Sequence, residues 1–167
     1  MYKEMRRSFE ESYKRRSALY RQRLAAWNDQ APIVRLAKPT NIARARALGY
    51  KAKQGVITVR VRVRGGTKKR HAPGGGRKPS KSGRFFTRHK SMRAIAEERA
   101  ARRYINTEVL NSYFAGRAGT YGYYEVIMLD RRSPSVANDA QYSGVTRRRG
   151  RAFRGMSSAG RRHRQMA

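Results

Sequence analysis

Three arginines alternate with valines in the stretch GVITVRVRVR, at positions Arg60, Arg62 and Arg64. Side chains two residues apart on a β-strand project from the same face and lie about 6.6 Å apart. This spacing is close to the reach between successive phosphates of a nucleic-acid strand, and guanidinium groups bind phosphate oxygens through paired hydrogen bonds. Charges on a sheet also serve solubility, but arginines without an acidic partner in their segment favour phosphate binding. The pattern therefore predicts that the three arginines contact adjacent phosphates.

A second basic stretch spans residues 65–90, where glycines and cations surround the adjacent aromatic residues Phe85 and Phe86. Aromatic side chains among cations can stack on unpaired bases while the charges bind phosphate. Alternatively, the two phenylalanines belong to the core beside the following helix. A loop of this length without a periodic apolar pattern is generally either functional or disordered. Its candidate nucleic-acid-binding residues are Lys68, Lys69, Arg70, Arg77, Lys78, Lys81, Arg84, Arg88, His89 and Lys90.

The net charge of the whole chain supports a polyanionic partner. The 167 residues include 41 Lys and Arg against 10 Asp and Glu, a formal net charge of +31. Residues 30–96 contain 19 basic side chains and no acidic one. Repulsion within such a segment opposes compaction, so nucleic acid is the expected partner. Arginine exceeds lysine 31 to 10, which favours close docking because the planar guanidinium both pairs with phosphate and stacks on bases.

The sequence offers little for catalysis or metal binding. Cysteine is absent, so disulfides, thiol nucleophiles and thiolate metal sites are excluded. His71, His89 and His163 lie in basic segments without a histidine or carboxylate at helical spacing. The glycine-rich stretches match neither GxxxxGK[ST] nor GxGxxG. We therefore expect no enzymatic activity, no cofactor and no small-molecule substrate.

An acidic pair, the apolar runs and the N-terminal segment also bear on which classes of protein the sequence excludes. Glu97 and Glu98 are adjacent on a predicted helix, where we expect ion pairs with Arg102 and Arg103 rather than acid–base catalysis. No apolar run approaches the ~20 residues of a transmembrane helix. The N-terminal segment MYKEMRRSFEESYKRR lacks the apolar core of a signal peptide. We expect a cytoplasmic protein with no membrane partner.

Apolar periodicity predicts the elements that position these residues. We expect one amphipathic helix over residues 3–28, a short helix over 40–48 and a strand over 55–64 with its valines on the face opposite the arginines. A helix over 91–104 and two strands, 109–115 and 121–129, follow, with GRAG as the hairpin turn. After Pro134 the chain is too rich in Arg and Gly to bury a core. Further nucleic-acid-binding candidates in this tail are Arg147, Arg148, Arg149, Arg151 and Arg154.

The predicted fold class is α+β: a small antiparallel sheet of three or four strands flanked by helices, with an extended basic loop and C-terminal tail. We expect a single domain over residues 1–167. Within it, a basic helical N-terminal region spans 1–50, an α/β core with the basic loop spans 55–130, and an extended basic tail spans 131–167.

Several segments, in the same order, resemble the archaeal and eukaryotic large-subunit ribosomal protein L15e family. They are LGYKAKQGVITVRVRVRGG (48–66), AEERAARRY (96–104), VLNSYFAG (109–116), YYEVIMLD (123–130) and FRGMSSAGRR (153–162). The resemblance implies a structural component of the large subunit that is embedded in its ribosomal RNA among neighbouring ribosomal proteins and supports translation. It also implies an antiparallel sheet with helices on both faces. The short C-terminus is similar to that of archaeal members.

The resemblance also implies which residues lie against RNA, because positions in this chain that match the family's motifs are expected to share the family's RNA contacts. The loop 65–90 is one such region, and the individual residues are Lys51, Lys53, Arg60, Arg62, Arg64, Arg161 and Arg162. Two other interpretations stay open from the residues alone. A generic nucleic-acid packaging protein explains the charge but not a hairpin core, and an RNA-modifying enzyme requires a pocket or cofactor motif that the sequence does not display.

Overall fold

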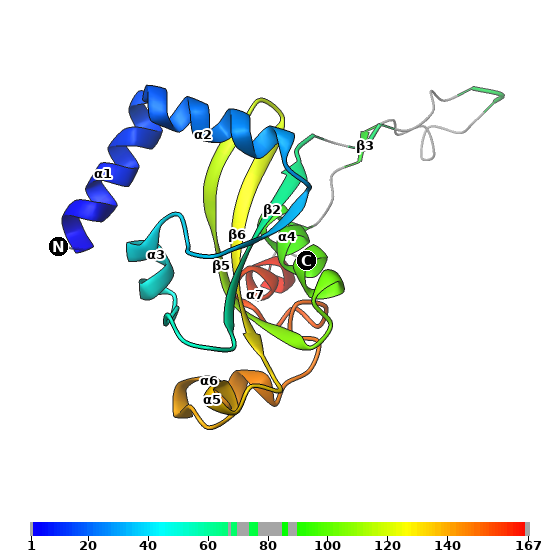
Figure 1. Ribbon diagram of the computed structural model, residues 1–167. Helices are drawn as coiled ribbons and strands as arrows, with labels where there is room; N and C mark the ends of the chain where they lie inside the picture. Colours follow the sequence, from blue (N-terminus) through cyan, green and yellow to red (C-terminus); the bar gives the residue numbers. More distant parts are fainter. Residues whose placement is uncertain (1, 67, 70–73, 77–84, 87–89, 166–167) are drawn as a thin grey trace.

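The computed structural model of the chain describes residues 2–66, 68–69, 74–76, 85–86 and 90–165. Its centre is a four-stranded antiparallel sheet with the strand order β1-β2-β6-β5 (Figure 1). Helices flank this sheet, so the predicted α+β class is confirmed. The strands are β1 (Ile33–Leu36), β2 (Val56–Arg64), β5 (Thr107–Ala118) and β6 (Tyr121–Asp130). The short edge strand β1 was not expected from the sequence.

One face of the sheet is aliphatic and is covered by helix α4 (Met92–Arg103). Val59, Val61 and Val63 of β2 are at most 1% exposed on this face, as their alternation predicts. The helix begins after Ser91, whose hydroxyl accepts a hydrogen bond of 3.2 Å from the Ala94 amide. This N-cap satisfies one of the amides left free at a helix start.

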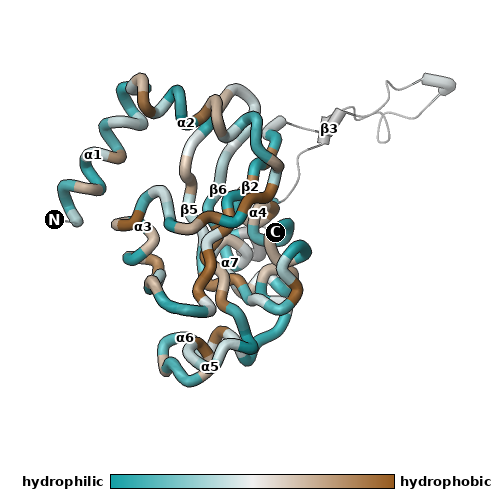
Figure 2. The backbone as a smooth tube through the Cα atoms, viewed as in Figure 1, coloured by the Kyte–Doolittle hydropathy of each residue, from teal (hydrophilic) through white to brown (hydrophobic). Residues whose placement is uncertain are grey.

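The opposite face is covered by α2 (Ala18–Asp29) and α3 (Ile42–Ala47). Tyr20, Leu24 and Trp27 of α2 are buried against the hairpin of β5 and β6. Figure 2 shows hydrophobic stretches along the strands, whereas α1 (Tyr2–Arg15) is largely hydrophilic. The sheet therefore lies between helices on both faces.

The N-terminal region forms two helices, α1 and α2, rather than the single helix expected over residues 3–28. Arg16 has a φ of +50°, in the left-handed region that ends a helix. Ser17 then caps α2 by accepting a hydrogen bond of 3.3 Å from the Tyr20 amide. Helix α1 buries no residue but lies against α3 and β5, where its Tyr13 ring contacts Phe114.

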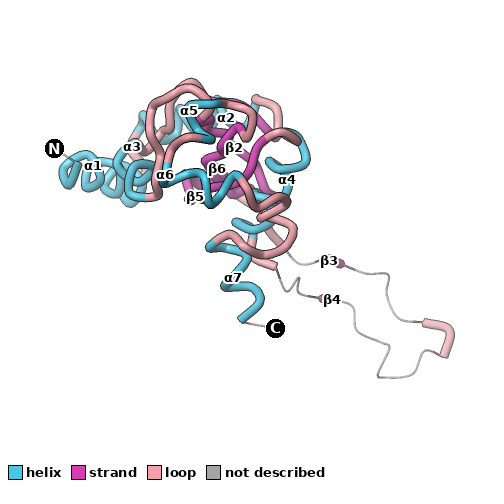
Figure 3. The backbone as a smooth tube through the Cα atoms, turned by 90° about the horizontal axis from the view of Figure 1, so that it is seen from below, coloured by secondary structure: helices cyan, strands magenta, loops and turns pink. Residues whose placement is uncertain are grey.

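Two short strands, β3 (Lys68–Lys69) and β4 (Phe85–Phe86), pair with each other in a separate antiparallel ribbon. The stretch 65–90 therefore contains backbone pairing that its sequence did not indicate. Figures 1 and 3 show this ribbon extending away from the sheet, on the side opposite α1. No helix in the described ranges is long and apolar enough to cross a membrane.

The hairpin turn lies later than predicted. Strand β5 continues through Gly116 to Ala118, and the two-residue turn is Gly119–Thr120. Gly119 has a φ of +53°, which suits the first position of such a turn. Gly116 has a packing role instead, because a Cβ atom there would lie 2.7 Å from the Tyr20 hydroxyl oxygen.

The expected extended tail over residues 131–167 is wrong for its described part. Three helices form there: α5 (Pro134–Ala137), α6 (Ala140–Thr146) and α7 (Ser158–Gln165). Val136, Tyr142, Ala152 and Ala159 are buried, and Tyr142 donates a hydrogen bond of 2.7 Å to the Gly49 carbonyl. Small side chains and hydrogen bonds fix this segment although its mean polarity is high.

Close backbone contact at Gly160 yields a prediction about this segment. A Cβ atom at Gly160 would lie 2.6 Å from the Gly155 Cα atom, which is backbone and cannot rotate away. Gly160→Ala should therefore lower the free energy of unfolding by about 1–3 kcal/mol in urea titrations. Gly144→Ala is the matched control, since its Cβ meets nothing within 4 Å. It should raise stability by about 0.5–1 kcal/mol through helix propensity. Equal effects of the two substitutions would contradict the packing described.

Candidate nucleic-acid interface

The three arginines of β2 do not form an open row of cations. Arg60 is only 7% exposed, Arg62 is partly buried and Arg64 alone is exposed. The reason is that α2 covers the face of the sheet on which they lie. The prediction that all three arginines are open to phosphates is therefore wrong for Arg60. Arg64, at the end of the strand, is the one that is exposed.

Arg60 is held inside the protein by neutral partners. Its guanidinium lies 4.3 Å from the centroid of the Trp27 ring and donates to the Gln30 side-chain oxygen. Burial lowers the pKa of Arg60, while the nearby charge of Glu125 opposes this shift. Arg62 donates to the Asn28 carbonyl at 2.5 Å, and its guanidinium lies 5.2 Å from the centroid of the Tyr121 ring. Both arginines thus attach α2 to the sheet.

Four other predicted RNA-binding residues also have partners within the chain. Lys51 and Lys53 lie 3.1 and 2.7 Å from the same carboxylate oxygen of Asp139. Hydrogen bonds from Lys53, the Gln141 amide and Lys51 lower the pKa of Asp139 to about 2. Lys90 pairs with Glu98 at 2.6 Å, and Arg151 donates to the Val109 carbonyl at 3.2 Å.

The remaining predicted residues divide into exposed, partly described and undescribed groups. Seven arginines are exposed, and their side chains have no hydrogen bond or ion pair with any described residue: Arg64, Arg147, Arg148, Arg149, Arg154, Arg161 and Arg162. Only the backbone of Lys68, Lys69, Phe85 and Phe86 is described, so the stacking predicted for the phenylalanines is untested. The residues outside the described part are Arg70, Arg77, Lys78, Lys81, Arg84, Arg88 and His89.

Exposed arginines converge where the C-terminal segment meets α4. We call Arg148, Arg151, Arg161 and Arg162 the C-terminal arginine cluster. The pKa of Arg151 is lowered first by burial and then by the positive charges of Arg148 and Arg161. Similarly, burial and the charges of Arg162 and Arg44 lower the pKa of Arg93. Mutual repulsion of this kind is relieved when an external anion lies among the cations.

Two acidic side chains near the cluster, Glu97 and Glu108, favour the charged form of Arg151, but both also accept hydrogen bonds within the core. Glu97 is 1% exposed and accepts hydrogen bonds from the Ser112 and Ser157 hydroxyls. Glu108 accepts backbone hydrogen bonds from Gly150 at 2.9 Å and Arg151 at 3.2 Å. These two carboxylates hold the C-terminal segment against α4 and β5.

A third buried carboxylate, Glu125, fastens the other face of the sheet. It is fully buried and accepts from the Thr40 amide at 2.9 Å, from the Thr40 hydroxyl and from the Tyr113 hydroxyl. Burial and the Glu125 charge raise the pKa of Tyr113, so its phenol stays protonated and donates. The sequence predicted ion pairs of Glu97 and Glu98 with Arg102 and Arg103. Glu98 does lie 3.8 Å from Arg102, but the buried Glu97 lies 3.9 Å from Arg93 instead.

Arg93, whose pKa is lowered by the charges of Arg162 and of Arg44 on α3, was missed as a neighbour of the cluster. It is separated from Arg162 by well over 60 positions in the chain, so no local pattern relates the two. Arg93 also donates to Ser112 at 2.8 Å and to Asn111 at 2.5 Å. Among the described residues, no group of three His, Asp or Glu side chains could hold a metal ion.

Comparison with known proteins places this basic α+β chain in a family. The Ribosomal L15e family, described as Ribosomal L15, matches residues 1–167. The chain belongs to the Ribosomal L15e family. This is a family of structural ribosome components and not of enzymes, as the sequence predicted.

Two relatives are named large ribosomal subunit protein eL15. The protein from Methanocorpusculum labreanum is 51% identical over 144 residues, which cover 86% of this chain and 74% of that protein. The protein from Metallosphaera sedula is 46% identical over 152 residues, which cover 89% of this chain and 70% of that protein. The resemblance to the L15e family that the motifs indicated is therefore confirmed.

The division of the β2 arginines into buried and exposed members can be tested by single substitutions. Arg60→Ser removes the contact with Trp27 and leaves Gln30 without its donor. It should lower the free energy of unfolding by about 1–3 kcal/mol. Arg64→Ser, at the exposed end of the same strand, should change it by no more than about 0.5 kcal/mol. Chemical denaturation measures both, and equal stability of the two variants would overturn the assignment of Arg60 to the core.

Burial of Glu97 predicts a pH dependence of stability. Burial is the largest influence on this carboxyl and raises its pKa above the ordinary value of 4.5, against the opposing effects of Ser112, Ser157, Arg93 and Arg151. The folded state therefore retains this proton to a higher pH than the unfolded state does. The contribution of Glu97 to stability should fall as pH rises from about 4.5 through its folded pKa.

Glu97→Gln keeps a side chain of similar shape but cannot ionise. Urea unfolding from pH 4 to 7 should therefore show the variant gaining stability relative to the natural chain as pH rises. Glu98→Gln on the same helix is the control, because it removes an ion pair with Lys90 and should show no such gain. A stability difference for Glu97→Gln that is constant with pH would contradict the prediction.

Proposed function

We propose that this chain is a structural constituent of the large ribosomal subunit that binds and stabilises folded large-subunit ribosomal RNA and thereby supports translation in the cytoplasm. The proposal rests chiefly on the C-terminal arginine cluster, whose positive charges repel one another. The nearby carboxylates accept hydrogen bonds within the core. Family membership and the names of the relatives support the same conclusion.

The chemistry of recognition follows from the types of exposed side chain. Arginine forks bind phosphate oxygens irrespective of sequence, and such contacts fix register and orientation on the RNA. We propose direct phosphate contacts by the seven exposed arginines and by the cations of residues 65–90. Lys51, Lys53, Lys90 and Arg151 keep internal partners and support the surface from which the exposed cations project.

The whole chain acts as one unit in this proposal, with residues 1–167 as a single domain. The ribbon of β3 and β4 extends away from the sheet and is suited to enter crevices of folded RNA (Figure 3). Neighbouring ribosomal proteins are further expected partners. We propose no membrane partner and no small-molecule substrate.

The salt dependence of RNA binding tests the role of the cluster. Each neutralised phosphate adds roughly 0.7–0.9 to the slope of log affinity against log salt. Removing three contacts with Arg148→Gln, Arg161→Gln and Arg162→Gln together should therefore reduce the slope by roughly 2–3. Filter binding of purified large-subunit ribosomal RNA at several salt concentrations measures this slope.

A second triple variant that removes the same formal charge elsewhere distinguishes the loss of specific phosphate contacts from the loss of net charge. Arg6, Arg7 and Arg102 are exposed arginines paired with Glu10, Glu11 and Glu98. Changing these three to Gln removes the same formal charge but should reduce the slope less, because their charges already have partners. Equal reductions would contradict the proposed interface. Release of the protein from large subunits in high-salt sucrose gradients would instead favour a packaging protein.

A further inference from the structure

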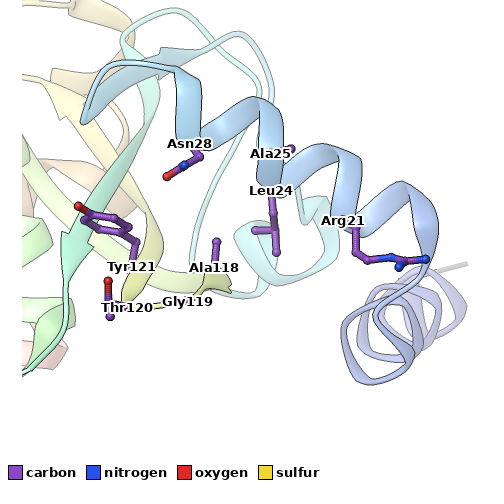
Figure 4. A pocket seen from close by; sticks show the side chains of 8 residues that line it. All are labelled: Arg21, Leu24, Ala25, Asn28, Ala118, Gly119, Thr120 and Tyr121. Atoms are coloured by element: carbon purple, nitrogen blue, oxygen red, sulfur yellow. The ribbon is translucent and has the colours of Figure 1, made fainter.

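A cavity of about 490 Å³ lies between α2 and the turn that joins β5 to β6. Figure 4 shows Leu24 and Asn28 pointing from the helix toward the hairpin residues Ala118 and Tyr121. Its volume is within the range of ~300–1,000 Å³ that is typical of ligand sites.

The lining combines an apolar floor with an aromatic edge. Leu24, Ala25 and Ala118 supply the apolar surface, and the partly buried ring of Tyr121 borders it. The guanidinium of Arg62 lies 5.2 Å from the centroid of this ring and donates to the Asn28 carbonyl, which fixes both groups. An apolar space beside a fixed ring suits an aromatic ligand that can stack on the ring.

Polar groups at the edge can recognise such a ligand. The side-chain oxygen of Asn28 lies near Arg62 and Tyr123, at 3.5 and 3.4 Å, whereas its amide nitrogen donates to no described residue. The exposed Thr120 hydroxyl likewise has no partner within the described ranges. An amide donor and a hydroxyl are groups that bind the edges of nucleobases.

The charge around the cavity selects an anionic ligand. The residues that line it include Arg21 and no carboxylate. Arg64 lies opposite Tyr121 in the pairing of β2 with β6, and Arg117 is exposed on the hairpin beside the turn. Cations around an apolar, aromatic space match a nucleotide, whose base is planar and whose phosphates are negative.

The cavity also lies at the base of the segment that leads to β3. The Gly65 amide donates a hydrogen bond of 2.7 Å to the Thr120 carbonyl, so the turn is tied to the point where the chain leaves β2. The backbone of Lys68 and Lys69 follows three residues later. The turn that borders the cavity is thus held next to the start of the basic stretch 65–90.

We propose that the cavity between α2 and the β5–β6 turn binds the base of an unpaired RNA nucleotide. Tyr121 supplies the stacking surface, Asn28 and Thr120 contact the base edge, and Arg21 and Arg64 contact the flanking phosphates. This inference rests on the proposed function, because it names the part of the RNA that one site on the protein recognises.

The test uses two RNA hairpins that differ only in one nucleotide. The first carries a single bulged 2-aminopurine, and the second is fully paired. The full-length chain should bind the bulged RNA roughly 5- to 150-fold more tightly, which corresponds to the ~1–3 kcal/mol of stacking one base on an aromatic side chain. Binding should also quench the fluorescence of the 2-aminopurine as it stacks.

Matched variants on α2 locate the effect. Ala25 lines the cavity and is exposed, so Ala25→Leu fills the space without disturbing the core. Ala26 is exposed on the same helix but is not part of the lining, and Ala26→Leu is the control. Ala25→Leu should abolish the preference for the bulged RNA, and Ala26→Leu should retain it. Tyr121→Leu, checked for folding by its melting temperature, should abolish the quenching.

Each outcome separates this inference from the proposed function. Equal binding of both hairpins by the natural chain, or a preference that survives Ala25→Leu, overturns the nucleotide site but leaves general RNA binding intact. Failure of the natural chain to bind either hairpin or large-subunit ribosomal RNA overturns the proposed function and the site together.

Discussion

The structure depends on where its few carboxylates lie. Glu97, Glu108 and Glu125 are all buried or nearly so, and each accepts hydrogen bonds from segments distant in the chain. A buried carboxylate is tolerated only when donors satisfy it, and here hydroxyl and backbone donors do so. The acids thus connect the covering segments to the sheet. Their use in the core leaves the surface with a large excess of arginine.

The two faces of the sheet are buried by different kinds of contact. The face under α4 is aliphatic, with valines of β2 at its centre. The face under α2 and α3 contains Arg60, Glu125 and Tyr113, which lie opposite one another across β2, β6 and β5. Stacking on Trp27 and hydrogen bonds compensate for the loss of hydration there. The middle of β2, around Arg60, is therefore buried on both faces, whereas the strand ends at the exposed Arg64.

The sequence was sufficient to predict the elements with strong periodicity and clear caps. The strand with alternating valines, the helix after Ser91 and the hairpin of β5 and β6 all lie close to their predicted bounds. The turn was displaced because Gly116 resembles a turn residue but instead makes room for Tyr20. The break at Arg16 had Ser17 as its only local signal.

The errors at the candidate interface came from long-range contacts. Arg60 looked like a surface cation because no local pattern reveals that Trp27 and Gln30 would cover it. The C-terminal segment looked unable to fold because its buried contacts are few and use small residues, supported by Glu97 and Glu108. The exposed arginines near the C-terminus were predicted individually, but the proximity of Arg162 to Arg93 depends on the tertiary fold.

The hydrogen bond between Ser157 and Glu97 has a thermodynamic consequence for the C-terminal arginine cluster, whose members lie on both sides of Ser157 in the chain. In an unfolded chain Arg148 and Arg161 are dispersed, whereas in the folded chain they stand together against Arg151. A polyanion that prefers the gathered cations necessarily favours the folded form, by an amount that grows with the logarithm of its concentration. Ordering of the C-terminal segment and capture of the anion are thus linked equilibria, and each strengthens the other.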